Sequence, residues 1–123
     1  MTHFRFYACI IMLALFIGGC TNDKNELPKP ADGCEINAAT ITWDNTVHSI
    51  IQNNCSIAGC HVSLTDGGNG IDYTAYSAVK GKITSGVFQN RVFTLRNMPL
   101  QPVTLSSCDL SKLKAWVDNG APQ

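Results

Sequence analysis

The sequence predicts a single all-α domain. Three stretches carry helical patterns, residues 43–53, 75–80 and 106–118, and polar or glycine-rich segments separate them. The chain has 123 residues, which is enough for one domain and too few for two. Its formal net charge is zero, so charge gives no reason to expect nucleic acid or an anionic membrane surface as a partner.

The first helix is predicted over residues 43–53. Asp44 or Asn45 is placed to cap the exposed amides at its start, and its end leads directly into Cys55. The apolar face of this helix consists of Val47, Ile50 and Ile51.

The last helix, over residues 106–118, has the clearest pattern. Ser106 or Ser107 caps its start, and Asp109 completes a capping-box-like sequence with Ser106. Asn119-Gly120 ends it. Its apolar stripe consists of Leu110, Leu113 and Val117, with Trp116 beside it.

The middle of the chain has weaker signals. Residues 65–70 form a glycine-rich loop. Thr74 is placed to cap a short helix over residues 75–80, and Gly81 is placed to end it. The pattern assigns no regular element to residues 88–95.

Residues 1–19 have the features of a lipoprotein signal peptide. The apolar run over residues 6–17 is too short to span a membrane comfortably. It ends in Ile17-Gly18-Gly19-Cys20, which resembles the lipobox of bacterial lipoproteins and predicts lipidation of Cys20. The alternatives are an ordinary secretory signal and an uncleaved anchor. Cleavage removes Arg5 and leaves 8 basic against 9 acidic residues.

The lipidated Cys20 begins a polar segment, residues 20–33, that contains two prolines and has little to bury. We expect a flexible tether here and a folded domain over residues 34–123. Everything after the signal peptide would lie outside the cytoplasmic membrane, where disulfides persist.

The four cysteines after Cys20 divide into two pairs. Cys55 and Cys60 belong to a motif described below, which leaves Cys34 and Cys108 to pair with each other. Such a bond would close a loop of about 75 residues and stabilise the fold by roughly 4 kcal/mol in the chain-entropy model. The alternative is that both cysteines are free or bind a metal.

The stretch Cys55-Ser56-Ile57-Ala58-Gly59-Cys60-His61 carries the main chemical signal. Two cysteines followed at once by a histidine are typical of c-type haem attachment, where two residues usually separate the cysteines. Four separate them here. Each thiol adds to one vinyl group of the porphyrin, and the histidine becomes a ligand of the iron. The extra residues must therefore loop outward, which Gly59 makes feasible.

Further candidate residues follow this motif. Met98 precedes Pro99, and a thioether is a soft ligand suited to haem iron. Arg91 can pair with a haem propionate, and the alternative is a solvated surface arginine. Tyr73 and Tyr76 can face the haem edge, and the alternative is ordinary packing.

The order of these features resembles a known family, the small monohaem cytochrome c domains of lipoproteins in Bacteroidota and related bacteria. The resemblance covers roughly residues 34–122. It rests on a helix, Cys55…Cys60-His61, a glycine-rich loop, the helix with Tyr76, Arg91, Met98-Pro99, Leu105-Ser106, and Ala115-Trp116-Val117-Asp118-Asn119-Gly120-Ala121-Pro122.

The resemblance implies a class I cytochrome c fold, in which the N- and C-terminal helices cross beside one covalently bound haem c. It also implies that His61 is the proximal and Met98 the distal ligand of the iron. The chain departs from the family's usual spacing, because four residues instead of two separate Cys55 and Cys60. Both thioethers, a single thioether, or a haem-free relic with a Cys55–Cys60 disulfide are compatible with this departure.

Three functions follow from these interpretations. With two axial ligands the iron has no open position, so we expect single-electron transfer to redox partner proteins and no enzymatic activity. The first alternative is a haem-free binding or structural lipoprotein, stapled by disulfides. The second is a haem sensor or oxidase-like site in which Met98 is displaced. A zinc site lacks a fourth ligand.

We expect a monomer that the lipid at Cys20 anchors in the cell envelope. Asp23 and Glu26 resemble the acidic tracts of surface-exported lipoproteins, which favours the outer over the inner membrane. The sequence leaves open whether the domain faces the periplasm or the cell surface.

Overall fold

The computed structural model describes residues 27–65 and 70–123. The predicted signal peptide, the lipidation of Cys20, the first part of the tether and residues 66–69 of the glycine-rich loop lie outside the described residues. Within the described ranges the chain is helical and has no strand, so the all-α prediction is confirmed there. No helix in this part of the chain has the length and apolar character needed to cross a bilayer.

The first helical segment comprises η1 (Trp43–Val47), a π-helix, and α2 (His48–Asn54), which continues it. This confirms the helix predicted over residues 43–53. The predicted cap was wrong. The N-cap is Thr42, whose side chain accepts a hydrogen bond from the Asn45 backbone N–H, while the Asn45 side chain accepts one from the Thr42 N–H.

Helix α3 (Tyr76–Thr84) is longer than predicted, and both of its predicted boundary residues were wrong. Thr74 does not cap it, because its N–H and hydroxyl both donate to the Asp72 carboxylate. Gly81 lies inside the helix, since Val79 and Ile83 are buried and their packing continues the helix past it. The chain turns instead at Gly86, whose φ is +74°.

The segment after Gly86 is helical, although the sequence pattern assigned it no element. It consists of α4 (Val87–Gln89) and the π-helix η2 (Asn90–Thr94). Phe88 and Val92 are buried on its inner side, and Arg91 is exposed. Single π-helical turns often occur at functional sites.

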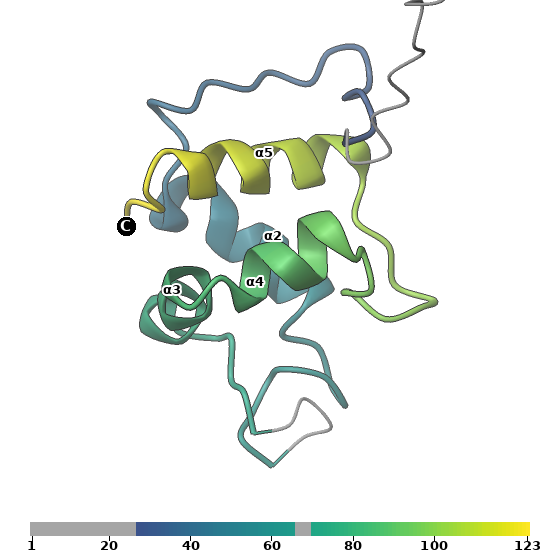
Figure 1. Cartoon of the computed structure of the whole chain (residues 1–123), viewed down its shortest axis with the longest axis vertical. Helices are drawn as coiled ribbons and strands as arrows, with labels where there is room; N and C mark the ends of the chain where they lie inside the picture. The colour runs from purple at the N-terminus through teal and green to yellow at the C-terminus, as the bar shows by residue number, and fades with distance from the viewer. Residues whose placement is uncertain (1–26, 66–69) are drawn as a thin grey trace, which may run out of the picture.

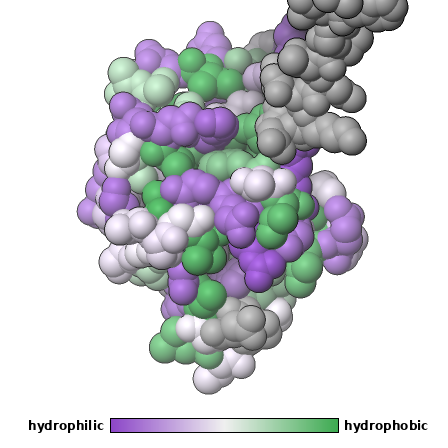
Figure 2. All heavy atoms as spheres, viewed as in Figure 1, coloured by the Kyte–Doolittle hydropathy of each residue, from purple (hydrophilic) through white to green (hydrophobic). Residues whose placement is uncertain are grey.

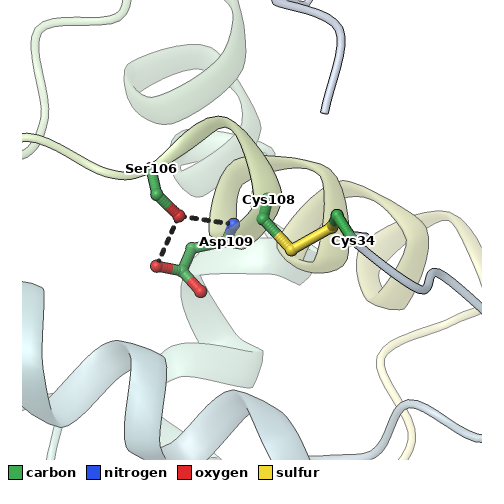
Figure 3. Close-up of a disulfide and its surroundings, with 4 residues drawn as sticks. All are labelled: Cys34, Ser106, Cys108 and Asp109. Atoms are coloured by element: carbon green, nitrogen blue, oxygen red, sulfur yellow. Dashed lines mark hydrogen bonds between the residues drawn. A yellow bond between two sulfur atoms is a disulfide. The ribbon is translucent and has the colours of Figure 1, made fainter. Parts of the chain in front are cut away.

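Helix α5 (Ser107–Asp118) is the longest helix of the described residues, and its prediction is confirmed. Ser106 is the N-cap, and its hydroxyl accepts from the Asp109 N–H at 3.0 Å (Figure 3). Its buried residues are Leu110, Leu113 and Trp116, so Trp116 takes the place in the apolar stripe that was predicted for Val117.

The predicted Cys34–Cys108 disulfide is present, with an S–S distance of 2.01 Å. It ties the segment that precedes η1 to the first turn of α5 (Figure 3). Residues 27–33, the described part of the predicted tether, form no helix, and Leu27 nevertheless packs against the core.

The core joins the two ends of the domain. Figure 1 shows α5 lying along one side of the molecule with α2 and α4 beneath it, and η1 packs against α5. The rings of Trp43 and Trp116 lie 6.2 Å apart between them. The Trp116 indole N–H donates to the Pro122 carbonyl at 2.8 Å, and the Trp43 backbone N–H donates to that same carbonyl at 3.1 Å.

Candidate functional site

A cavity of about 280 Å³ lies among three regions that are far apart in the sequence, residues 54–61, 71–73 and 87–103. Its size is close to the roughly 300 Å³ at which ligand pockets begin. The residues that line it are Asn54, Cys55, Gly59, Cys60, His61, Ile71, Tyr73, Val87, Phe88, Arg91, Val92, Met98, Pro99, Leu100 and Val103. Among them are Tyr73 and five of the other six residues predicted to bind the cofactor.

The cysteine motif forms a closed loop on one wall of the cavity. Cys55 ends α2, and its N–H donates to the Ile51 carbonyl at 2.8 Å. The His61 N–H donates to the Cys55 carbonyl at 3.0 Å and closes the loop. Gly59 has a φ of +78°, and it lies with Ala58 at the exposed tip. Ala58 and Gly59 therefore lie at the surface, Ser56 and Ile57 are half-buried, and Gly59 lines the cavity together with Cys55, Cys60 and His61.

The His61 ring is oriented by a backbone acceptor. Its Nδ1 lies 3.2 Å from the Ile71 carbonyl oxygen. Because a carbonyl only accepts hydrogen bonds, this contact requires a proton on Nδ1, and in the neutral ring the lone pair is then on Nε2. Histidines that bind metals are typically oriented by such a bond from their second ring nitrogen.

The two thiols of the motif are free and are not bonded to each other. Burial, and secondarily the charge of nearby Cys60, raises the pKa of Cys55 from its ordinary value of 9.0 to about 12. Burial, and secondarily the charge of Cys55, also raises the pKa of Tyr73. This wall of the cavity is therefore an environment that disfavours charge.

Another part of the wall brings Arg91 and Met98 together. The Arg91 carbonyl accepts hydrogen bonds from the Asn97 N–H at 3.1 Å and the Met98 N–H at 3.3 Å. Met98 is half-buried and packs against the core. Arg91 extends from η2 at an exposed position. The end of η2 thus fixes the backbone from which Met98 is presented to the cavity.

The rim of the cavity is apolar and open to solvent. Val87 is 43% exposed and Leu100 is 65% exposed. Other exposed large apolar side chains are scattered over the surface, and on the face drawn in Figure 2 apolar residues are interspersed with polar ones.

Tyr76, the sixth predicted residue, does not line the cavity. Its hydroxyl donates to the Ala121 carbonyl at 2.9 Å, and its ring lies edge-on to Trp43 at 5.8 Å between centroids. As the first residue of α3 it is directed toward η1 and the C-terminal segment. Tyr76 is therefore a packing residue in the structure, which was the alternative to its facing the haem edge.

Sequence reasoning missed one contributor to the site. The Ile71 carbonyl is a backbone group, so no residue type signals it. Tyr73 was one of two candidate tyrosines, and the structure places it on the cavity wall beside His61. Residue type alone does not distinguish the two tyrosines, because the choice depends on where α3 begins.

Comparison of the chain with family models, with curated proteins and with solved structures found no match. Across residues 27–65 and 70–123, no three His, Cys, Asp or Glu side chains gather closely enough to hold a metal ion by themselves.

Proposed function

We propose that this protein is a c-type cytochrome that carries single electrons through one covalently bound haem. The observation that carries the proposal is the convergence of Cys55, Cys60, His61, Arg91 and Met98 on one cavity. These residues span more than a third of the chain. Each has a side chain suited to one part of haem binding: thioether attachment, iron ligation or pairing with a propionate.

The residues of the cavity fit a haem group. Cys55 and Cys60 would hold it through thioether bonds, and the Nε2 of His61 and the sulfur of Met98 would be the axial ligands. Arg91 would pair with a propionate. When bound, the haem supplies reversible one-electron chemistry at its iron.

The lining supports a haem that packs against apolar side chains and is open to solvent at the rim formed by Val87 and Leu100. Apolar side chains from α4, η2 and the segment after Met98 cover the cavity, namely Val87, Phe88, Val92, Leu100 and Val103. Methionine ligation and burial both favour a relatively high reduction potential. With His61 and Met98 both held on the iron, the site would offer no position for a substrate, so the proposal assigns electron transfer and no enzymatic activity.

The finer fold assignment is also part of the proposal. A class I cytochrome c fold requires the first and last helices to pack together beside the haem. The packing of η1 against α5, and the position of Cys55 at the end of α2, support this arrangement. The lipid anchor at Cys20, the envelope location, the monomeric state and the redox partner proteins complete the proposal.

The haem-free alternative requires a Cys55–Cys60 disulfide. Both thiols are free in the structure, whereas Cys34 and Cys108 are bonded. The alternative also gives no reason for His61 to line the cavity beside both cysteines. These observations favour the haem-binding proposal.

A redox titration of the full chain, expressed with cytochrome c maturation, tests the proposal. We expect one reversible one-electron transition and, in the oxidised protein, a sulfur-to-iron charge-transfer band that Met98→Leu abolishes. His61→Ala should prevent formation of the low-spin spectrum, whereas His48→Ala, which removes a histidine that contacts Trp43 outside the cavity, should not. Absence of a redox transition, or carbon monoxide binding as strong in the wild type as in Met98→Leu, would contradict the proposal.

A further inference from the structure

We propose that Tyr73 is a positioning residue that holds the imidazole of His61 in one orientation and one tautomer. The inference rests on the proposed function, since it assigns a role toward the residue that would bind the iron. Tyr73 would touch neither the iron nor the electron-transfer reaction directly, and it would act through His61.

Residues 71–73 contact His61 at three points. The Ile71 carbonyl accepts from the ring edge at Nδ1, at 3.2 Å. The Tyr73 backbone N–H donates to the His61 carbonyl at 2.8 Å. The rings of Tyr73 and His61 lie 4.5 Å apart between centroids, at an interplanar angle of 30°. The same short segment therefore fixes the edge, the backbone and one face of the histidine.

The Tyr73 ring is itself held in place. Its side chain is only 8% exposed and belongs to the hydrophobic core. The backbone beside it is fixed by an Asx-type turn, in which the Asp72 carboxylate accepts from the Thr74 N–H at 2.8 Å and from the Thr74 hydroxyl at 2.6 Å. An aromatic ring that cannot move aside prevents the imidazole that lies against it from rotating freely.

This arrangement complements the hydrogen bond to Ile71. A single bond at Nδ1 allows the ring to tilt about the axis of that bond, whereas contact with its face opposes such a tilt. A rotation that broke the hydrogen bond from Nδ1 to Ile71 would also remove the preference for the Nδ1–H tautomer. The proton could then lie on either ring nitrogen. In the neutral ring the stack thus keeps the proton on Nδ1 and the lone pair on Nε2, as an iron ligand requires.

The experiment compares three variants in the full chain. Tyr73→Phe keeps the ring, Tyr73→Leu removes it, and Tyr76→Leu removes the other tyrosine, which contacts Trp43 and not His61. Should Tyr73→Leu not fold, Tyr73→Met replaces it, because an unbranched side chain fills irregular space. The readout is nitrogen-15 NMR of the His61 ring, together with the reduction potential of the haem-loaded protein.

We expect the wild type and Tyr73→Phe to show a slowly exchanging Nδ1 proton. Tyr73→Leu should accelerate that exchange at least tenfold and shift the reduction potential, and Tyr76→Leu should do neither. Unchanged exchange in Tyr73→Leu, equal acceleration in Tyr76→Leu, or acceleration in Tyr73→Phe would overturn the inference.

The outcome is separable from that of the proposed function. If the chain binds no haem, the proposed function fails, and the tautomer of His61 is then measured in the haem-free chain. A single Nδ1–H tautomer in the wild type that becomes mixed in Tyr73→Leu would support the positioning role. Equal tautomer populations in both proteins would contradict it.

Discussion

At the scale of single residues, burial governs the chemistry of the Cys55 thiol. Burial raises the pKa of Cys55 to about 12, so this thiol stays protonated at every pH at which proteins are usually handled. Thiolates are the reactive form of cysteine. The structure therefore predicts that Cys55 is chemically inert in the folded, haem-free chain.

Alkylation of the haem-free chain tests this prediction. At pH 8 we expect iodoacetamide to modify Cys55 at least about tenfold more slowly in the folded chain than in the chain unfolded by urea. Peptide mapping by mass spectrometry measures the rate at each cysteine. Equal rates at Cys55 in the folded and unfolded chains would show that the thiol is not shielded.

The raised pKa of Cys55 also makes the stability of the haem-free fold depend on pH. The pKa of Cys55 is higher in the folded than in the unfolded chain, so ionisation favours unfolding. Stability should be constant with respect to this thiol below about pH 9 and should fall as the pH rises toward 12. In Cys55→Ala this component of the fall should be absent when unfolding is followed by circular dichroism.

The residues of the candidate site divide by how well their side-chain chemistry identifies them. Cys55, Cys60, His61 and Met98 are predictable because few other roles explain these side chains in this order. Tyr73 and Tyr76 are chemically equivalent, and only the packing of α3 decides which one lies on the cavity wall. The Ile71 carbonyl is invisible to sequence reasoning, since every residue has one.

At the scale of the elements, Gly81 and Gly86 offer a matched pair of substitutions. Gly81 lies in the interior of α3 and is exposed, and a Cβ there meets no atom within 4 Å. Gly86 has the same open surroundings but a φ of +74°. Alanine at the two positions therefore differs only in its effect on the backbone.

We expect Gly81→Ala to stabilise the fold by about 0.5–1 kcal/mol, because alanine has the higher helix propensity. Gly86→Ala should destabilise it by about 1–2 kcal/mol, because a side chain at positive φ is strained. Urea denaturation of both variants measures the two effects. Destabilisation by Gly81→Ala would indicate that Gly81 ends the helix, as the sequence alone suggested.

The start of α5 gives a second test at this scale. Ser106→Ala removes the hydroxyl that accepts from the Asp109 N–H and donates to its carboxylate. The loss should be about 1 kcal/mol of stability. Ser107→Ala is the control, because Ser107 is the first residue inside the helix and does not cap it. A larger effect at Ser107 would place the cap one residue later.

Helix boundaries were the least predictable features of the fold. The helical segments themselves follow from apolar spacing, as α5 and the η1–α2 segment show. The ends depend on tertiary packing, which carries α3 past Gly81 and orders α4 and η2 where the sequence has no regular apolar stripe. The cap at Thr42 was missed because Asp44 and Asn45, which are stronger N-cap residues than threonine, lie two and three positions after it.

At the scale of the whole molecule, the disulfide joins parts of the chain that are 74 residues apart. Loss of this link in Cys34→Ala/Cys108→Ala should lower the stability by roughly 4 kcal/mol, since it restricts the unfolded chain. Denaturation of the haem-loaded protein by guanidinium measures the difference. A loss below about 1 kcal/mol would mean that the unfolded chain is already restricted by residual structure without the disulfide.

The shape of the cavity could not be read from the sequence. The motifs predict which side chains would bind a haem, but their convergence depends on α2, η2 and the segment after η2 packing around one volume. The sequence therefore predicts the residues that would bind the haem, and the fold brings them together around one cavity. We propose that this cavity holds a covalently attached haem.

The pyridine haemochrome spectrum of the matured protein, recorded after denaturation and acid-acetone extraction, tests that claim most directly. We predict that the haem stays with the polypeptide and that its α-band has the position typical of two thioether bonds. Replacement of either Cys55 or Cys60 should move the band to the single-thioether position. Colourless protein, or haem that is extracted completely, would contradict the account.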